Sequence, residues 1–183
     1  MYNIIIYLIK AILPLIALFN KKIRLFVSGR KIVWTTLNEK LDKNARYVWL
    51  HAASLGEFEQ GLPVAKALRA QGYKILITFF SPSGYEVRKN TPDADIVVYL
   101  PLDTRSNARK FVQLVNPVMA IFVKYEFWVN YLNELKKAQD AFATDNVEYH
   151  TLTNYNFLIE EAVASNYIKQ EDVEKLLEWR NNL

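Results

Sequence analysis

The alternation of short apolar runs with helical stretches between residues 47 and 137 constrains the fold of this chain most strongly. Apolar runs typical of strands occur at Tyr47–Leu50, Lys74–Phe80, Ile96–Leu100 and Val118–Val123. Stretches with helical character follow each of them, at Glu57–Ala70, Ser83–Asn90, Thr104–Val115 and Phe127–Lys137. Strands that alternate with helices of about this length form βαβ units, so we predict an α/β domain built on a parallel sheet.

Three loops are expected to meet at one edge of this sheet. Parallel sheets carry their functional loops at the carboxyl ends of the strands. The segments that follow predicted strands there are 52–56, 81–84 and 124–126, and each contains small, polar or charged residues. We therefore predict a single crevice lined by these three loops.

Glu57 is the first candidate for chemistry at this edge. It stands in the segment His51–Pro63, where a strand-like run passes through a turn of small residues into a helix. A carboxylate in the first turn of a helix is kept ionised by the helix dipole and can accept a proton from a hydroxyl group. The competing interpretation is structural, because Ser54 and Glu57 have the spacing of a capping box. His51, on the strand itself, is interpreted as a core histidine.

A second acidic candidate and a possible anion site lie in the other two loops. Glu126, between Tyr125 and Phe127, either pairs with a cation such as Lys124 or has a function, since a partly buried carboxylate needs one or the other. In the loop that contains Ser83 and Gly84, hydroxyl and N–H groups either bind an anion or form a simple turn and helix cap.

The N-terminal segment, residues 1–30, is predicted to associate with a membrane. Ile4–Phe19 contains sixteen residues with one charge, Lys10, and a cluster of lysine and arginine follows it. The run is shorter than the about 20 residues of a spanning helix, and it lacks the pattern of a secretory signal. We expect a helix that lies in the membrane surface or inserts partly, with the basic cluster at anionic headgroups. The alternative is an apolar helix packed on the domain.

Charge and composition narrow the possible partners. Residues 1–137 carry 20 basic and 10 acidic residues, a net charge of +10, whereas residues 138–183 carry 3 and 9, a net charge of −6. The basic body predicts an anionic partner, but no recognition motif points to nucleic acid. The chain has no cysteine and two histidines, which excludes disulfides and cysteine-based zinc sites, and no metal site is expected. The basic residues at 88, 89, 105, 109 and 110 are interpreted as a solvated face.

Several motifs taken in order resemble one known family. They are Asn20-Lys21-Lys22, Gly29-Arg30, HAASLGEFEQGLPVAKAL, TFFSPSGYE, YLPLD and KYEFWVNYL. Over about residues 1–137 they look like the 3-deoxy-D-manno-octulosonic acid (Kdo) transferases of lipopolysaccharide biosynthesis. The resemblance implies the Rossmann-like N-terminal half of a two-domain GT-B glycosyltransferase. That half would bind the lipid A precursor at the cytoplasmic face of the bacterial inner membrane, and the other half would bind CMP-Kdo.

The resemblance also implies roles for individual residues. Glu57 would be the general base that deprotonates the acceptor hydroxyl, and Glu126 would be a second acidic residue of the site. Four residues would contact the acceptor: Ser54, Gly56, Ser83 and Gly84. The chemistry of this family implies no metal and no other cofactor.

The last 46 residues depart from the family pattern. After Lys137 the family continues with a further strand and a nucleotide-binding domain, whereas 138–183 is an acidic segment in which 158–164 and 172–179 are predicted to be amphipathic helices. We therefore expect three regions: a membrane-associating segment (1–30), the acceptor domain (31–137) and an unrelated helical tail. Transferase activity is expected only with a donor-binding half. The alternative is a non-catalytic protein that binds a membrane surface through its basic face.

Overall fold

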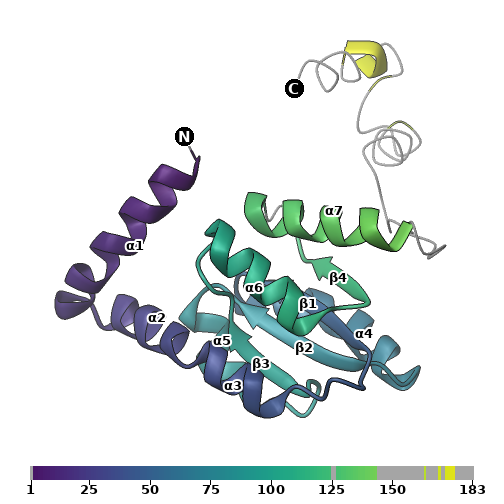
Figure 1. Cartoon of the computed structure of the whole chain (residues 1–183), viewed down its shortest axis with the longest axis horizontal. Helices are drawn as coiled ribbons and strands as arrows, with labels where there is room; N and C mark the ends of the chain where they lie inside the picture. Colours follow the sequence, from purple (N-terminus) through teal and green to yellow (C-terminus); the bar gives the residue numbers. More distant parts are fainter. Residues whose placement is uncertain (1, 125–126, 144–162, 164–168, 170–171, 176–183) are drawn as a thin grey trace. The chain divides into compact units, whose positions relative to one another are not determined.

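The computed structural model describes residues 2–124, 127–143, 163, 169 and 172–175 (Figure 1). The chain divides into two compact units, Met1–Ala138 and Gln139–Leu183, and the following account concerns the first. In the second unit, residues 173–175 are helical, in agreement with the start of the helix predicted at 172–179. The predicted helix at 158–164 lies outside the described residues, except for residue 163.

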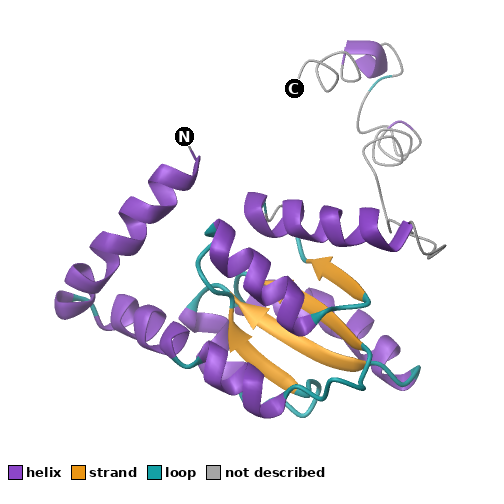
Figure 2. Ribbon diagram, in the orientation of Figure 1, coloured by secondary structure: helices purple, strands orange, loops and turns teal. Residues whose placement is uncertain are grey.

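The core of the first unit is a sheet of four parallel strands (Figure 2). The strands are β1 (Tyr47–Ala52), β2 (Lys74–Phe79), β3 (Ile96–Tyr99) and β4 (Met119–Phe122), in the order β3-β2-β1-β4. The chain builds outward from β1 to β3 and then returns to the other side of β1 with β4. The direction of strand addition therefore reverses between β1 and β4, and open α/β sheets bind ligands at such a point.

Helices cover both faces of the sheet. On one face lie α4 (Leu55–Ala70) and α5 (Pro82–Arg88); on the other lie α3 (Val33–Lys40), α6 (Arg105–Val115) and the beginning of α7 (Val129–Ala143). Successive strand residues point to opposite faces, so Trp49 packs with α3 and α6 while Leu50 packs with α4. The predicted α/β fold with a parallel sheet is confirmed, and each predicted strand and helix between residues 47 and 137 is present with shifted ends.

Two helices precede the sheet in a segment for which no element was predicted. They are α2 (Lys21–Lys31) and α3, which place Phe26, Val33 and Leu37 in the core. The buried residues of α3 are four positions apart, which is helical spacing, but a helix of 8 residues is too short for this pattern to stand out in the sequence. The boundary predicted between residues 30 and 31 falls within α2.

The N-terminal helix α1 (Tyr2–Phe19) is largely exposed. It is long and apolar enough to cross a membrane by length and composition, and Ala17 is its one buried residue. Its two ends are attached to the rest of the unit. The Tyr2 hydroxyl donates a hydrogen bond to Asp103, and the Arg24 guanidinium of α2 donates to the carbonyls of Ala17 and Leu18. An exposed apolar helix is thus attached at both of its ends to a folded body.

Candidate functional site at the strand ends

The loops after β1, β2 and β4 meet at the carboxyl edge of the sheet, as predicted. The Ser81 N–H donates to the Ala53 carbonyl at 2.9 Å, which joins the loops after β2 and β1. The Val123 N–H donates to the His51 carbonyl at 3.0 Å, which joins the start of the loop after β4 to β1. Glu126, the second predicted acidic residue, lies outside the described residues. The loop that leads to Glu57 therefore lies at the carboxyl edge of the sheet, beside the switch point between β1 and β4.

Glu57 lies half-buried in the first turn of α4. Its Oε2 accepts a hydrogen bond from the Ser54 N–H at 2.9 Å, as in a capping box. Among the described residues no group donates to Oε1. The structural and functional interpretations therefore do not compete: one oxygen of the carboxylate holds the helix start, and the other is available to accept a proton.

The two glycines predicted to contact an acceptor have different surroundings. A Cβ atom on Gly56 would meet no atom within 4 Å, so the packing of this chain does not require glycine there. A Cβ atom on Gly84 would overlap the Phe79 ring, and that glycine is one of the buried residues of α5. Gly84 thus has a packing role, whereas Gly56 leaves open space beside Glu57. Ser83 is exposed, with its Oγ 2.6 Å from that of Ser81.

His51 is buried and forms part of a polar network beneath the site. Its Nε2 lies 2.9 Å from the Trp128 indole nitrogen, which can only donate, so Nε2 accepts and the ring proton is on Nδ1. That proton is shared between the Thr78 carbonyl at 3.1 Å and the Thr78 Oγ1 at 2.8 Å. Trp49 donates to the same Oγ1 at 2.7 Å. The interpretation of His51 as a core histidine is confirmed, and the network attaches Trp128, in the loop after β4, to β1 and β2.

Comparison with known proteins assigns this arrangement to a family. Residues 28–145 match the family model described as 3-deoxy-D-manno-octulosonic-acid transferase (kdotransferase). The chain belongs to the Kdo transferase family. The match begins after the N-terminal helix and continues to residue 145. It therefore extends beyond residue 137, near which the resemblance identified from the sequence motifs ended. Both the switch point of the sheet and Glu57 lie inside the matched range.

Individual Kdo transferases are similar to part of the chain. The 3-deoxy-D-manno-octulosonic acid transferase of Aquifex aeolicus is 40% identical over 82 residues, which are 44% of this chain and 23% of that protein. The Haemophilus influenzae protein of the same name is 33% identical over 91 residues, 48% of this chain and 21% of that protein. The chain thus spans less than a quarter of the length of these relatives.

A shorter similarity connects the chain to a different class of enzyme. The orotate phosphoribosyltransferase of Cytophaga hutchinsonii is 51% identical over 45 residues, 25% of this chain and 22% of that protein.

Arg30, which belongs to the Kdo transferase match, places a positive charge near the site and was not predicted. Its guanidinium donates to three carbonyls: Phe26 at 3.1 Å, Phe80 at 2.9 Å and Leu100 at 2.9 Å. Burial lowers the pKa of Arg30 to about 9, which still leaves it protonated at neutral pH. No described carboxylate pairs with it, so its charge is not neutralised locally. The one sequence signal for Arg30 was its place in the Gly29-Arg30 motif. The structure explains the glycine of that motif, because a Cβ atom on Gly29 would overlap the Tyr99 ring.

Asp103, in the YLPLD motif of this Kdo transferase chain, is a second residue that sequence reasoning missed. Its buried carboxylate accepts hydrogen bonds from the N–H groups of Asn130 and Tyr131, both at 3.2 Å, and so caps the start of α7. The Asn130 side chain donates back to the Asp103 carbonyl at 2.6 Å. Asp103 therefore fixes the point at which the loop containing Glu126 enters α7. The described residues contain no group of three or more metal-ligating side chains.

Proposed function

We propose that this chain provides the acceptor-binding half of an enzyme that transfers Kdo from CMP-Kdo to the lipid A precursor, with Glu57 as general base. The observation that carries this proposal is the state of the Glu57 carboxylate at the switch point. One oxygen is held by the Ser54 N–H, the other is available, and Gly56 leaves open space beside it. Membership of the Kdo transferase family supports the choice of reaction.

The reaction follows from a base in this position. Glu57 accepts the proton of an acceptor hydroxyl as the oxygen of that hydroxyl forms a bond to the anomeric carbon of Kdo. The bond from that carbon to the CMP phosphate breaks at the same time, and CMP leaves with the electron pair. Ser54 and Ser83 would position the acceptor sugar, and Glu126 would act as a second acidic residue. The donor would be held by a domain of the kind found in full-length relatives.

A membrane-bound acceptor agrees with the charge and the apolar helix. Arg30 provides a fixed positive charge near the strand ends, which suits a phosphorylated glycolipid. We place the protein at the cytoplasmic face of the inner membrane, with α1 in the bilayer surface or partly inserted. Ten large apolar side chains of α1 are exposed, an arrangement that is stable in lipid but not in water: Ile4, Ile5, Tyr7, Leu8, Ile9, Ile12, Leu15, Ile16, Leu18 and Phe19.

The test uses the full chain with lipid IVA as acceptor. Lipid IVA binding is measured for wild type and Glu57→Gln, and transfer from CMP-Kdo is measured after addition of a separately expressed donor domain. We expect both proteins to bind lipid IVA and only the wild type to support transfer. Glu59→Gln is the matched control, because Glu59 is an exposed acid of the same helix turn that pairs with Arg88. Equal transfer by wild type and Glu57→Gln would refute the assignment of the base.

A second candidate function, a non-catalytic protein that binds membrane surfaces, is favoured by the distribution of charge. The helices α2, α3 and α6 carry nine basic residues and one acidic residue. In the same assay this function predicts binding that depends on the total negative charge of the vesicles and not on the sugar of lipid IVA. It also predicts no transfer with an added donor domain.

We infer a separate origin for the acidic segment beyond residue 145, where the Kdo transferase match ends. Residues 138–183 carry a net charge of −6, against +10 for residues 1–137. Limited proteolysis should release a stable fragment that ends near residue 145 and retains lipid IVA binding. A fragment that loses both folding and binding would contradict it.

A further inference from the structure

Two groups of basic residues on the helices around the sheet differ in their partners. On the sheet face covered by α4 and α5, each lysine and arginine of these helices, with Lys89 at the end of α5, forms an ion pair. The pairs are Lys66–Asp93, Arg69–Asp95, Arg88–Glu59 and Lys89–Glu86. This side of the domain is therefore close to neutral.

The helices α2, α3 and α6 carry basic residues that have no acidic partner among the described residues. Five lie in α2, one in α3 and three in α6, and none forms an ion pair with a described residue. We call eight of these residues the cationic face: Lys21, Lys22, Arg24, Lys31, Lys40, Arg105, Arg109 and Lys110. The ninth, Arg30, is directed to the carbonyls of Phe80 and Leu100 and is not included. Glu39 is the one acidic residue in the three helices. Uncompensated charge of this density attracts anions and is not needed for folding.

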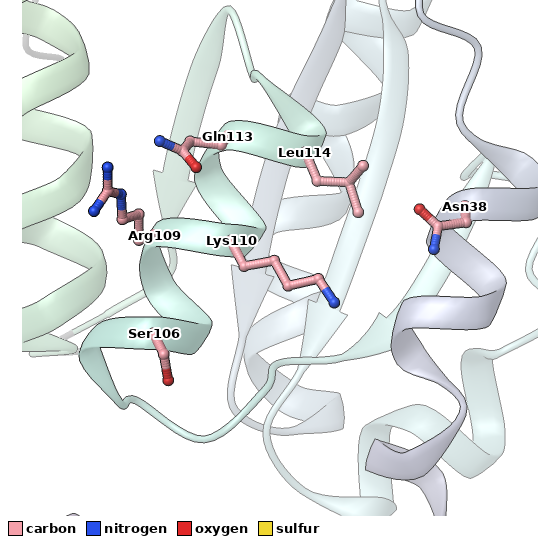
Figure 3. Close-up of a pocket in the computed structure, with 6 residues that line it drawn as sticks. All are labelled: Asn38, Ser106, Arg109, Lys110, Gln113 and Leu114. Carbon is pink, nitrogen blue, oxygen red and sulfur yellow. The ribbon is translucent and has the colours of Figure 1, made fainter.

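A pocket of about 560 Å³ lies on this face between α3 and α6 (Figure 3). Its lining contains two cations and three neutral polar side chains, and no acid: Asn38, Ser106, Arg109, Lys110, Gln113 and Leu114. Figure 3 shows Lys110 extending from α6 toward α3, while Arg109 leaves the other side of α6. The Lys110 Nζ lies 4.3 Å from the centre of the Trp34 ring, which orients the ammonium group without neutralising it.

We propose that this pocket binds the phosphate of an anionic phospholipid headgroup, so that a bilayer docks on the cationic face. Lys110 supplies positive charge inside the pocket, Arg109 adds charge on the other side of α6, and the Asn38, Ser106 and Gln113 side chains can donate hydrogen bonds to phosphate oxygens. The source is lipid because the apolar helix α1 belongs to the same compact unit and leads directly into α2.

Two side chains in and next to α3 support a lipid partner. Trp34, partly exposed, belongs to the residue type enriched at the headgroup level of membranes. Ile32, between α2 and α3, has 52% of its surface exposed. The inference rests on the membrane location in the proposed function, but the residues involved are separate from Glu57 and the strand-end loops.

The experiment measures binding of the full chain to vesicles by flotation. Vesicles of phosphatidylcholine are compared with vesicles that also contain phosphatidylglycerol. The variant Arg109→Gln/Lys110→Gln should bind the anionic vesicles about 25-fold more weakly than wild type, because each basic residue near a charged bilayer contributes roughly 5-fold. The control Arg88→Gln/Lys89→Gln removes the same charge from the ion-paired face and should change binding by less than about 3-fold, since those charges are already compensated.

Each outcome decides between the proposal and an alternative. Equal losses in the two double variants would mean that only net charge matters, which would overturn the pocket. Displacement of wild type from vesicles by millimolar inorganic phosphate, at constant ionic strength, would indicate a site for free phosphate and would also overturn it. Lipid IVA binding in detergent micelles separates this inference from the proposed function: the Arg109/Lys110 variant should bind lipid IVA as wild type does, whatever the result with Glu57→Gln.

Discussion

The indole N–H of Trp128 lies 2.9 Å from Nε2 of His51, although the two residues are 77 positions apart. This contact attaches the end of the loop after β4 to the central strand β1. The Trp128 ring also stacks with Phe80, at 4.7 Å between ring centres, in the loop after β2. One side chain therefore connects the loops after β4 and β2 to strand β1.

Replacement of Trp128 by phenylalanine should weaken this connection. Trp128→Phe keeps an aromatic ring against Phe80 but leaves the buried Nε2 of His51 without its indole donor. We expect the free energy of unfolding, measured by urea denaturation, to fall by about 1–2 kcal/mol. Trp34→Phe is the matched control, because the Trp34 indole N–H has no hydrogen-bond partner among the described residues; its loss should be below about 0.5 kcal/mol. Equal losses would show that the ring, not the N–H, stabilises the loop.

Asp103 should be the more sensitive of the two anchors of this loop. Asp103→Asn removes the charge that caps α7 and replaces one acceptor oxygen by a donor facing the Asn130 or Tyr131 N–H. We expect a loss of about 2–3 kcal/mol in the free energy of unfolding. Tyr2→Phe removes one hydrogen bond to the same carboxylate and should cost about 1 kcal/mol. Asp42→Asn, in an exposed turn, serves as control, and a loss there as large as at Asp103 would contradict a specific role for the cap.

The bond between Tyr2 and Asp103 should make stability depend on alkaline pH. Burial, and then the hydrogen bond to the Asp103 carboxylate, raise the pKa of the Tyr2 hydroxyl well above its ordinary value of 10.0. Tyr2 thus holds its proton more tightly in the folded protein than in the unfolded one. Its contribution is complete below pH 10 and is lost as the pH rises above that value. The difference in unfolding free energy between wild type and Tyr2→Phe should therefore shrink as the pH rises above about 10; a constant difference would refute the coupling.

The fold could be predicted from the sequence because each element of the sheet has a local signature. The runs that became β1 to β4 are apolar and short, and the intervening stretches have helical spacing. The helices α2 and α3 were missed because their contacts are distant in sequence. Arg30 is held by the carbonyls of Phe80 and Leu100, and nothing near residue 30 indicates those partners.

The candidate site was predicted unevenly for a similar reason. The capping-box spacing of Ser54 and Glu57 is local, so the position of Glu57 at a helix start was visible in the sequence. Gly84 was assigned to the acceptor, but its packing against Phe79 depends on how α5 lies on the sheet. Asp103 caps a helix that begins 26 residues later, and a cap supplied from another loop has no sequence signature.

The capping and catalytic roles of Glu57 should be separable by substitution. A glutamine side chain can still accept the Ser54 N–H through its amide oxygen, and glutamine is compatible with a capping box. Glu57→Gln should therefore change the free energy of unfolding by less than about 0.5 kcal/mol, while Glu57→Ala should lose about 1 kcal/mol. Thermal and urea unfolding measure both. A Glu57→Gln protein that is as unstable as Glu57→Ala would mean that any loss of transfer reflects misfolding and not the missing base.

Gly56 and Gly84 should respond in opposite ways to the same added methyl group. In Gly56→Ala the new Cβ meets open space and replaces a poor helix former, so stability should rise by up to about 1 kcal/mol. In Gly84→Ala the Cβ overlaps the Phe79 ring, and we expect a loss of about 1–3 kcal/mol. If the open space at Gly56 receives the acceptor, Gly56→Ala should also bind lipid IVA at least about 10-fold more weakly, since a misplaced methyl group in a contact is worth 1–3 kcal/mol. A stabilised Gly56→Ala protein with unchanged lipid IVA affinity would mean that the acceptor does not occupy the open space beside Gly56.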